Sequence, residues 1–115
     1  MIISVSGCSK NEIDNSEKLY VMENCDEPIK PFITLYQTDE KRFSFLPSGV
    51  SSYVAYGEYS IEDKVLTLIS DDGKMYVFKI DGTSLIFDEG KSSEIIEYKD
   101  FATPTDRTIF KLEKN

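Results

Sequence analysis

Short runs of β-branched and aromatic residues, separated by turn residues, make up the chain from residue 32 onward. Within these runs apolar side chains recur at every second position, which is the side-chain period of a β-strand. The spacing of runs and turns is that of an antiparallel meander, and helix-like spacing is limited to one or two turns at 90–101. The pattern predicts seven strands, at 32–37, 42–46, 53–61, 64–70, 74–80, 83–88 and 107–112.

Turn-forming residues join the four predicted strands over 53–88 into three successive hairpins. Asp81-Gly82 predicts a two-residue type I′ turn, because both central residues of that turn require positive φ, which Gly and Asp tolerate. The sequences at 62–63 and 71–73 are expected to form the neighbouring turns in a similar way.

The alternation also predicts which side chains face the core. The inner set is Tyr59, Ile61, Leu66, Leu68, Tyr76, Phe78, Ile80, Leu85 and Phe87. The opposite face carries more apolar residues than a solvated face needs, namely Val54, Tyr56, Val65, Ile69, Met75, Val77 and Ile86. We expect an all-β fold, an antiparallel meander that closes into a small lipocalin-like barrel or a curled sheet. The second apolar face is then covered by the terminal segments or meets a partner.

Residues 9–31 are mostly polar and end in the turn-forming Pro28 and Pro31. We interpret them as a tether that holds one short candidate strand at 19–22. The expected organisation is a truncated signal peptide or lipobox remnant over 1–8, this tether over 9–31, and a β domain over 32–115. A chain of 115 residues fits one domain, which at this size buries roughly two-thirds of its unfolded surface.

Charge and composition narrow the function classes. The chain has 21 acidic and 13 basic residues, a net charge of -8, and the basic residues are scattered, so nucleic acid is not an expected partner. It contains no histidine, which excludes Ser-His-Asp and Cys-His catalysis and every zinc site that needs histidine. Its two cysteines cannot form a four-cysteine zinc site. A disulfide between Cys8 and Cys25 stays open, since the sequence does not give their distance.

Residues 28–96 contain the motifs Ser51-Ser52-Tyr53, Gly57-x-Tyr59, Asp71-Asp72-Gly73-Lys74 and Ser92-Ser93, with "PFITLY" and "FSF" upstream. In these motifs the stretch resembles a β-rich domain found at the extracytoplasmic tail of BlaR-type antirepressor metallopeptidases and in small lipoproteins of Gram-positive bacteria. It implies an extracytoplasmic location. The chain has neither the H-E-x-x-H helix of the peptidase nor the S-x-x-K of a penicillin-sensing domain, so neither activity is implied.

Cys8 ends the stretch Val5-Ser6-Gly7-Cys8, which looks like a bacterial lipobox. In such a motif the cysteine receives a diacylglyceryl group, and two acyl chains anchor a protein stably to the membrane. The predicted location is therefore outside the cytoplasm, anchored by lipid to the cell membrane. Only seven residues precede Cys8, without the basic region and the usual apolar stretch of a signal peptide. The alternative is an incidental thiol in an N-terminal strand.

Other candidate sites follow from side-chain chemistry. Cys25 has acidic neighbours, which disfavour a thiolate, so we expect a partly buried, unreactive cysteine. The acidic residues Asp63, Asp71, Asp72 and Asp81 lack the spacing of a calcium loop, and we assign them to turns. We expect a rim for a ligand or partner at Ser51, Ser52, Tyr53 and Tyr56, near the start of the longest strand.

No catalytic residue, cofactor or metal is predicted. The preferred hypothesis is a non-enzymatic, membrane-tethered extracytoplasmic β-domain that binds a partner protein, peptide or envelope component. The second is a lipocalin-like carrier or sensor of a small apolar molecule, with an aromatic-lined cavity. The third is a hydrolase with two carboxylates, which requires two facing acids and a raised pKa.

Overall fold

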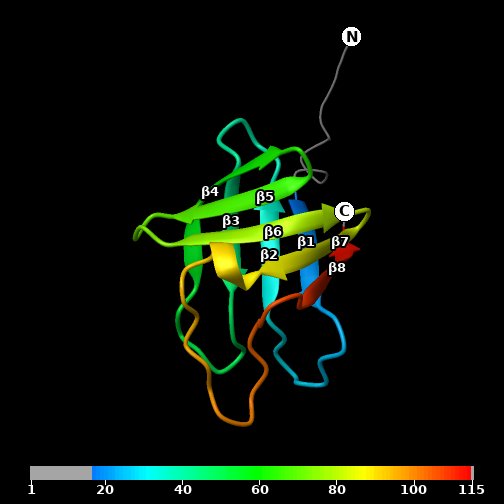
Figure 1. Ribbon diagram of the computed structural model, residues 1–115, viewed down its shortest axis with the longest axis vertical. Helices are drawn as coiled ribbons and strands as arrows, with labels where there is room; N and C mark the ends of the chain where they lie inside the picture. Colours follow the sequence, from blue (N-terminus) through cyan, green and yellow to red (C-terminus); the bar gives the residue numbers. More distant parts are fainter. Residues whose placement is uncertain (1–16, 115) are drawn as a thin grey trace.

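Eight antiparallel strands form one closed barrel, in which each strand pairs with its neighbours in sequence and β1 pairs with β8 (Figure 1). This computed structural model describes residues 17–114. The strands are β1 (Glu17–Met22), β2 (Phe32–Tyr36), β3 (Arg42–Leu46), β4 (Ala55–Glu62), β5 (Val65–Ser70), β6 (Met75–Asp81), β7 (Ser84–Asp88) and β8 (Ile109–Lys114), with a short 3-10 helix η2 (Glu89–Lys91) after β7.

The all-β meander predicted from the sequence is confirmed, and each of the seven predicted strands matches an observed one to within two residues at either end. The eighth strand, β1, includes the candidate strand at 19–22. It pairs with β2 on one side and β8 on the other, and so closes the barrel. Within the described residues the barrel therefore includes β1, which lies in the stretch 9–31 interpreted as a tether. Of the helical turns expected at 90–101, only η2 forms.

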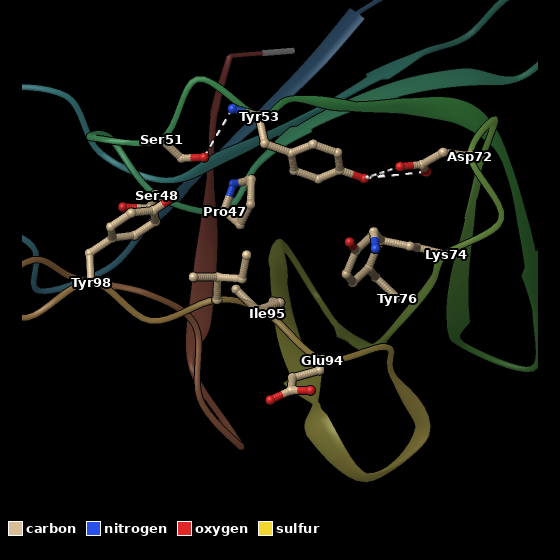
Figure 2. Close-up of a pocket in the computed structure, with 11 residues that line it drawn as sticks. Pro47, Ser48, Ser51, Tyr53, Asp72, Lys74, Tyr76, Glu94, Ile95 and Tyr98 are labelled. Carbon is tan, nitrogen blue, oxygen red and sulfur yellow. Dashed lines mark hydrogen bonds between the residues drawn. The ribbon is translucent and has the colours of Figure 1, made fainter.

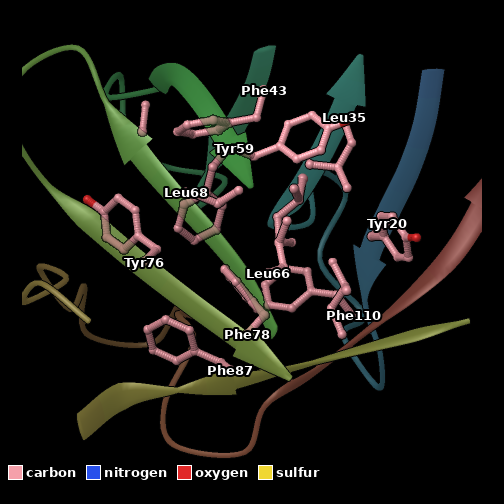
Figure 3. Close-up of a cluster of buried hydrophobic side chains, with 14 of the residues drawn as sticks. Tyr20, Leu35, Phe43, Tyr59, Leu66, Leu68, Tyr76, Phe78, Phe87 and Phe110 are labelled. Carbon is pink, nitrogen blue, oxygen red and sulfur yellow. The ribbon is translucent and has the colours of Figure 1, made fainter. Parts of the chain in front are cut away.

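Aromatic rings fill the centre of the barrel (Figure 3). Phe45 packs edge to face against Tyr76, Phe78 and Phe110, with ring centroids 5.0, 5.9 and 6.2 Å apart. Phe78 contacts Phe87 as well, at 5.2 Å. Because β3, β6, β7 and β8 each contribute rings to this cluster, the interior joins distant parts of the chain. The shape is lipocalin-like, but side chains occupy the interior where a carrier would hold its ligand.

The predicted inner face is correct except at the rim. Ile61 is 54% exposed although its partner in the ladder, Leu66, is fully buried. The reason is its place at the end of β4, next to the hairpin turn, where the neighbouring strands no longer cover it. On the outer face Val77 is buried, whereas Tyr56, Ile69 and Met75 are exposed, so this face is covered only in part.

The hairpin turns differ in one detail from the prediction. Asp81 pairs with Ser84, so the central residues of that turn are Gly82 and Thr83, and only Gly82 has positive φ. This is the pattern of a type II′ turn, and the predicted type I′ turn is wrong. The turn with positive φ at both central residues lies instead at 63–64, between β4 and β5.

The two ends of the barrel carry different connections. One end, which we call the hairpin end, holds the short connections 37–41, 63–64 and 82–83. β1 also begins at this end, and β8 finishes there. The opposite end, which we call the loop end, holds the connections 23–31, 47–54, 71–74 and 89–108. In Figure 1 the three longest of these project together below the sheet.

Candidate functional site

A pocket of about 310 Å³ lies at the loop end, between connections that are far apart in the sequence (Figure 2). Its walls are mostly apolar and include three tyrosines. The lining residues are Pro47, Ser48, Ser51, Tyr53, Asp72, Lys74, Tyr76, Glu94, Ile95, Ile96 and Tyr98. They come from the β3–β4 connection, the β5–β6 turn with the first residues of β6, and the β7–β8 connection. Figure 2 shows the ring of Tyr53 and the side chain of Ile95 facing the same space.

Hydrogen bonds join the first two of these walls. The hydroxyl of Tyr53 donates to the carboxylate of Asp72, with 3.0 Å to Oδ2, and the hydroxyl of Ser70 donates to Asp72 Oδ1. The backbone N–H of Lys74 donates to Ser70 Oγ at 2.9 Å. Ser70 is buried at the end of β5, and its two hydrogen bonds fix the conformation of the β5–β6 turn. Asp72 in this turn then holds the Tyr53 hydroxyl at the mouth of the pocket.

The β7–β8 connection forms the third wall because two serines attach it to β6. Ser93 N–H donates to the carbonyl of Met75 at 2.6 Å, and Met75 N–H donates back to Ser93 Oγ at 2.9 Å. Ser92 Oγ accepts from Val77 N–H at 2.9 Å. These bonds pair the backbone groups of β6 that lie beyond the end of β7, and they place Ile95 beside the pocket.

The ionisation states of the pocket follow from its contacts. Hydrogen bonds from Ser70 and then from Tyr53 lower the pKa of Asp72, so this carboxylate is charged at neutral pH. Burial raises the pKa of Tyr76, and the neighbouring Tyr53 hydroxyl raises it further. Burial also raises the pKa of Tyr53. The pocket therefore presents neutral phenols beside an ionised carboxylate, whereas a hydrolase of the third hypothesis needs a carboxyl group whose pKa is raised.

The structure brings together only part of the predicted rim. Ser51 and Tyr53 line the pocket, and Ser51 Oγ accepts from Tyr53 N–H at 2.9 Å. Ser52 is exposed and does not line it. Tyr56 projects from the outside of β4 and lines a separate, smaller depression beside Asp71.

Sequence reasoning missed most of the remaining walls. The period of two predicts Tyr76 in the core, and the residue is 1% exposed, but one side of it borders the pocket. The sequence around Asp72 indicates only a turn. Ile95 and Tyr98 lie in a segment with no strand pattern, so no periodic signal marks them. Of the motifs on which the resemblance was based, Ser51, Tyr53, Asp72 and Lys74 line the pocket, and Ser92 and Ser93 attach its third wall to β6.

The cysteines and acidic turns stand apart from the pocket. Cys25 is buried against the core from the β1–β2 connection, more completely than the partial burial predicted, and Cys8 lies outside the described residues. Within 17–114 no three potential metal ligands come close enough together to hold an ion. Over the same range no helix has the length and apolar character needed to span a bilayer.

Large apolar side chains are also exposed around the loop end. They are Ile29 in the β1–β2 connection, Val50 in the β3–β4 connection, and Ile96, Tyr98 and Phe101 in the β7–β8 connection. These connections contact one another. A Cβ atom on Gly49 would lie 2.0 Å from the carbonyl oxygen of Ile29, and Ala102 N–H donates to Glu27 Oε2 at 2.6 Å. The three connections therefore form one continuous surface.

Comparison with known proteins adds no relatives to this description. No model of a known protein family matches the chain, and searches of curated proteins and of solved structures find no match either.

Proposed function

We propose that this chain is a non-enzymatic, membrane-tethered extracytoplasmic β-domain that binds a partner protein, peptide or envelope component at its loop end. One observation carries the proposal: the apolar pocket and five exposed large apolar side chains share a single end of the barrel. Exposed apolar side chains gathered in this way mark interaction sites in soluble domains. Tyrosine, which is present both in the pocket and on the exposed surface, is one of the residue types enriched at the energetic hot spots of interfaces.

The end at which the chain enters the barrel suits a tether. β1 begins at the hairpin end, so a chain that runs from a lipid anchor at Cys8 to Glu17 enters the domain there. The loop end then points away from the membrane and is accessible to a partner. The lipobox-like stretch ending in Cys8 and the resemblance to extracytoplasmic tail domains support this arrangement.

The anchor is tested by metabolic labelling. The gene, expressed from its own chromosomal reading frame in a Gram-positive host, is expected to give a membrane-bound product that incorporates labelled fatty acid. Cys8→Ala should abolish the label, and Cys25→Ala is the matched control that should retain it. Equal labelling of the two variants, or no label in the unmodified protein, would contradict the anchor.

Binding at the loop end is tested by photocrosslinking in the same cells. A benzophenone amino acid replaces Tyr98 at the loop end or, as the control, Gln37 at the hairpin end; both residues are exposed. We expect a discrete adduct from position 98 and none from position 37. Adducts from position 37 alone, or from neither position, would contradict the proposed binding surface.

A second candidate function rests on the pocket itself. Its volume of about 310 Å³ reaches the low end of the roughly 300–1,000 Å³ of small-molecule sites, and its tyrosines suit a small apolar ligand. Such a ligand sits at the mouth, because aromatic side chains fill the interior. Native mass spectrometry of the purified chain distinguishes this function, since a carrier retains a small molecule that Tyr98→Ala releases.

A further inference from the structure

We infer that the loop end receives a basic polypeptide segment that inserts one bulky apolar or aromatic side chain into the pocket. This inference rests on the proposed function and specifies the chemistry of the partner. Three observations support it: the size of the pocket, the apolar surface that continues beyond it, and the charge of the surrounding loops.

The pocket has the dimensions and lining of an anchor site. At about 310 Å³ it is near the lower limit of small-molecule sites, which fits one large side chain better than an extended ligand. Pro47, Ile95 and the rings of Tyr53 and Tyr76 provide apolar walls. Asp72, Lys74 and Glu94 add charged groups, and Ser48 and Ser51 add hydroxyls. Energetic hot spots at interfaces are such anchors in desolvated pockets.

Apolar surface extends past the pocket and would contact residues that flank an anchor. Ile96 and Tyr98 lie on its wall, and Ile96 is 72% exposed. Ile29, Val50 and Phe101 extend the surface along the three connected loops. A single small molecule in the pocket would leave these side chains in water, whereas a polypeptide covers them as well.

The charge of the loop end selects among polypeptides. Connections 23–31, 47–54, 71–74 and 89–108 carry ten acidic and five basic side chains, so a net charge of -5 resides at this end. Complementary charge raises the association rate and disfavours partners of like charge. A basic segment is therefore favoured. The same charge opposes an anionic bilayer surface and nucleic acid, which separates a polypeptide from the other occupants of an apolar surface.

Four synthetic peptides test this inference with the isotope-labelled chain in NMR titrations. Three share a central phenylalanine and differ in their flanks, which hold four lysines, four serines or four glutamates. The fourth has lysine flanks and a central serine. We expect the lysine-flanked phenylalanine peptide to shift resonances of 47–54 and 94–98, with at least about tenfold higher affinity than each of the others.

Charge-reversal variants provide the matched control. Glu94→Lys, Glu97→Lys and Asp100→Lys together reverse exposed acids at the loop end, and Asp39→Lys, Glu40→Lys and Glu62→Lys do so at the hairpin end. The first set should weaken binding of the basic peptide at least about tenfold and the second set less than about twofold. Equal effects of the two sets would overturn the assignment of charge to this site.

The remaining outcomes separate this inference from the proposed function. If the serine-flanked or glutamate-flanked peptide shifts the same resonances as tightly as the basic one, the loop end binds peptides but the basic partner is wrong. If no peptide shifts any loop-end resonance, the inference fails, whereas the proposed function is decided separately by the crosslinking from position 98. If phosphatidylglycerol vesicles broaden the loop-end resonances in place of the peptides, the surface contacts lipid and the inference is overturned.

Discussion

Tyr76 is almost completely buried at the start of β6, between the aromatic core and the floor of the pocket. An ionised oxygen on its ring would therefore have little contact with water. Burial is the main cause of its raised pKa, as it is for Tyr20, Tyr53 and Tyr59. Folding therefore favours the neutral form of these phenols.

The free energy of unfolding should fall as the pH rises above about 10, the ordinary pKa of tyrosine. Below that pH both states keep the phenolic protons; above it the unfolded chain loses them while the folded chain retains them, so unfolding becomes favourable. Tyr76→Phe removes the largest of these shifts and should reduce the decline. Urea unfolding of both proteins between about pH 8 and pH 11 measures it.

The control for this comparison is the chain in concentrated urea, where all tyrosines should titrate near about pH 10 by ultraviolet absorbance. An unchanged decline in Tyr76→Phe would show that Tyr76 does not contribute to the loss of stability at high pH.

At the scale of the element, β4 depends on one glycine. Gly57 pairs with Phe43 on β3 and with Ser70 on β5, and the backbone of β5 comes close to it. A Cβ atom at this position would lie 2.0 Å from the carbonyl oxygen of Ile69 and 2.7 Å from Cα of Ser70. Glycine in a strand often marks such a close approach, and here it lets β4 pair with β3 and β5 at the same residue.

Gly57→Ala is expected to destabilise the fold by about 3 kcal/mol, the upper part of the range for overpacked sites, because the atoms in the way are backbone atoms. Midpoints of urea denaturation measure the change. Gly90→Ala is the matched control, since its Cβ would approach nothing closer than 3.7 Å. A loss at position 57 no larger than at position 90 would contradict the close approach.

The elements themselves were predictable because their period and turn residues are local properties. The side-chain period of two located the strands at 65–70 and 75–81 almost to the residue. The register of a two-residue turn depends on which residues pair, so the glycine at position 82 indicated a turn without fixing its type. The walls of the pocket were harder to predict from the sequence, because Ile95 and Tyr53 meet only after the barrel closes.

At the scale of the whole molecule, Phe45 connects strands from different parts of the barrel. It lies on β3 and contacts rings on β6 and β8, three strands that are far apart in the sequence. Edge-to-face pairs of this kind add to the free energy already gained from burial. The centre of the molecule is thus held by contacts that form only when the meander closes.

Phe45→Ala is expected to lower the free energy of unfolding by about 3–5 kcal/mol, the cost of removing a fully buried ring. Thermal or urea denaturation followed by near-ultraviolet circular dichroism measures the loss. Phe101→Ala, at an exposed loop position, should change stability by less than about 0.5 kcal/mol. Similar losses in the two variants would show that the ring cluster does not stabilise the barrel.

Closure of the sheet has a further consequence for recognition and evolution. Because β1 pairs with β8, the described barrel has no unpaired border strand along which a second polypeptide can extend the sheet. A partner cannot then bind by adding a strand to the sheet, and under the proposed function recognition falls to the loops and their side chains. Those side chains can be exchanged one at a time while the strand pairing stays intact, so the same barrel can acquire a new specificity without a new fold.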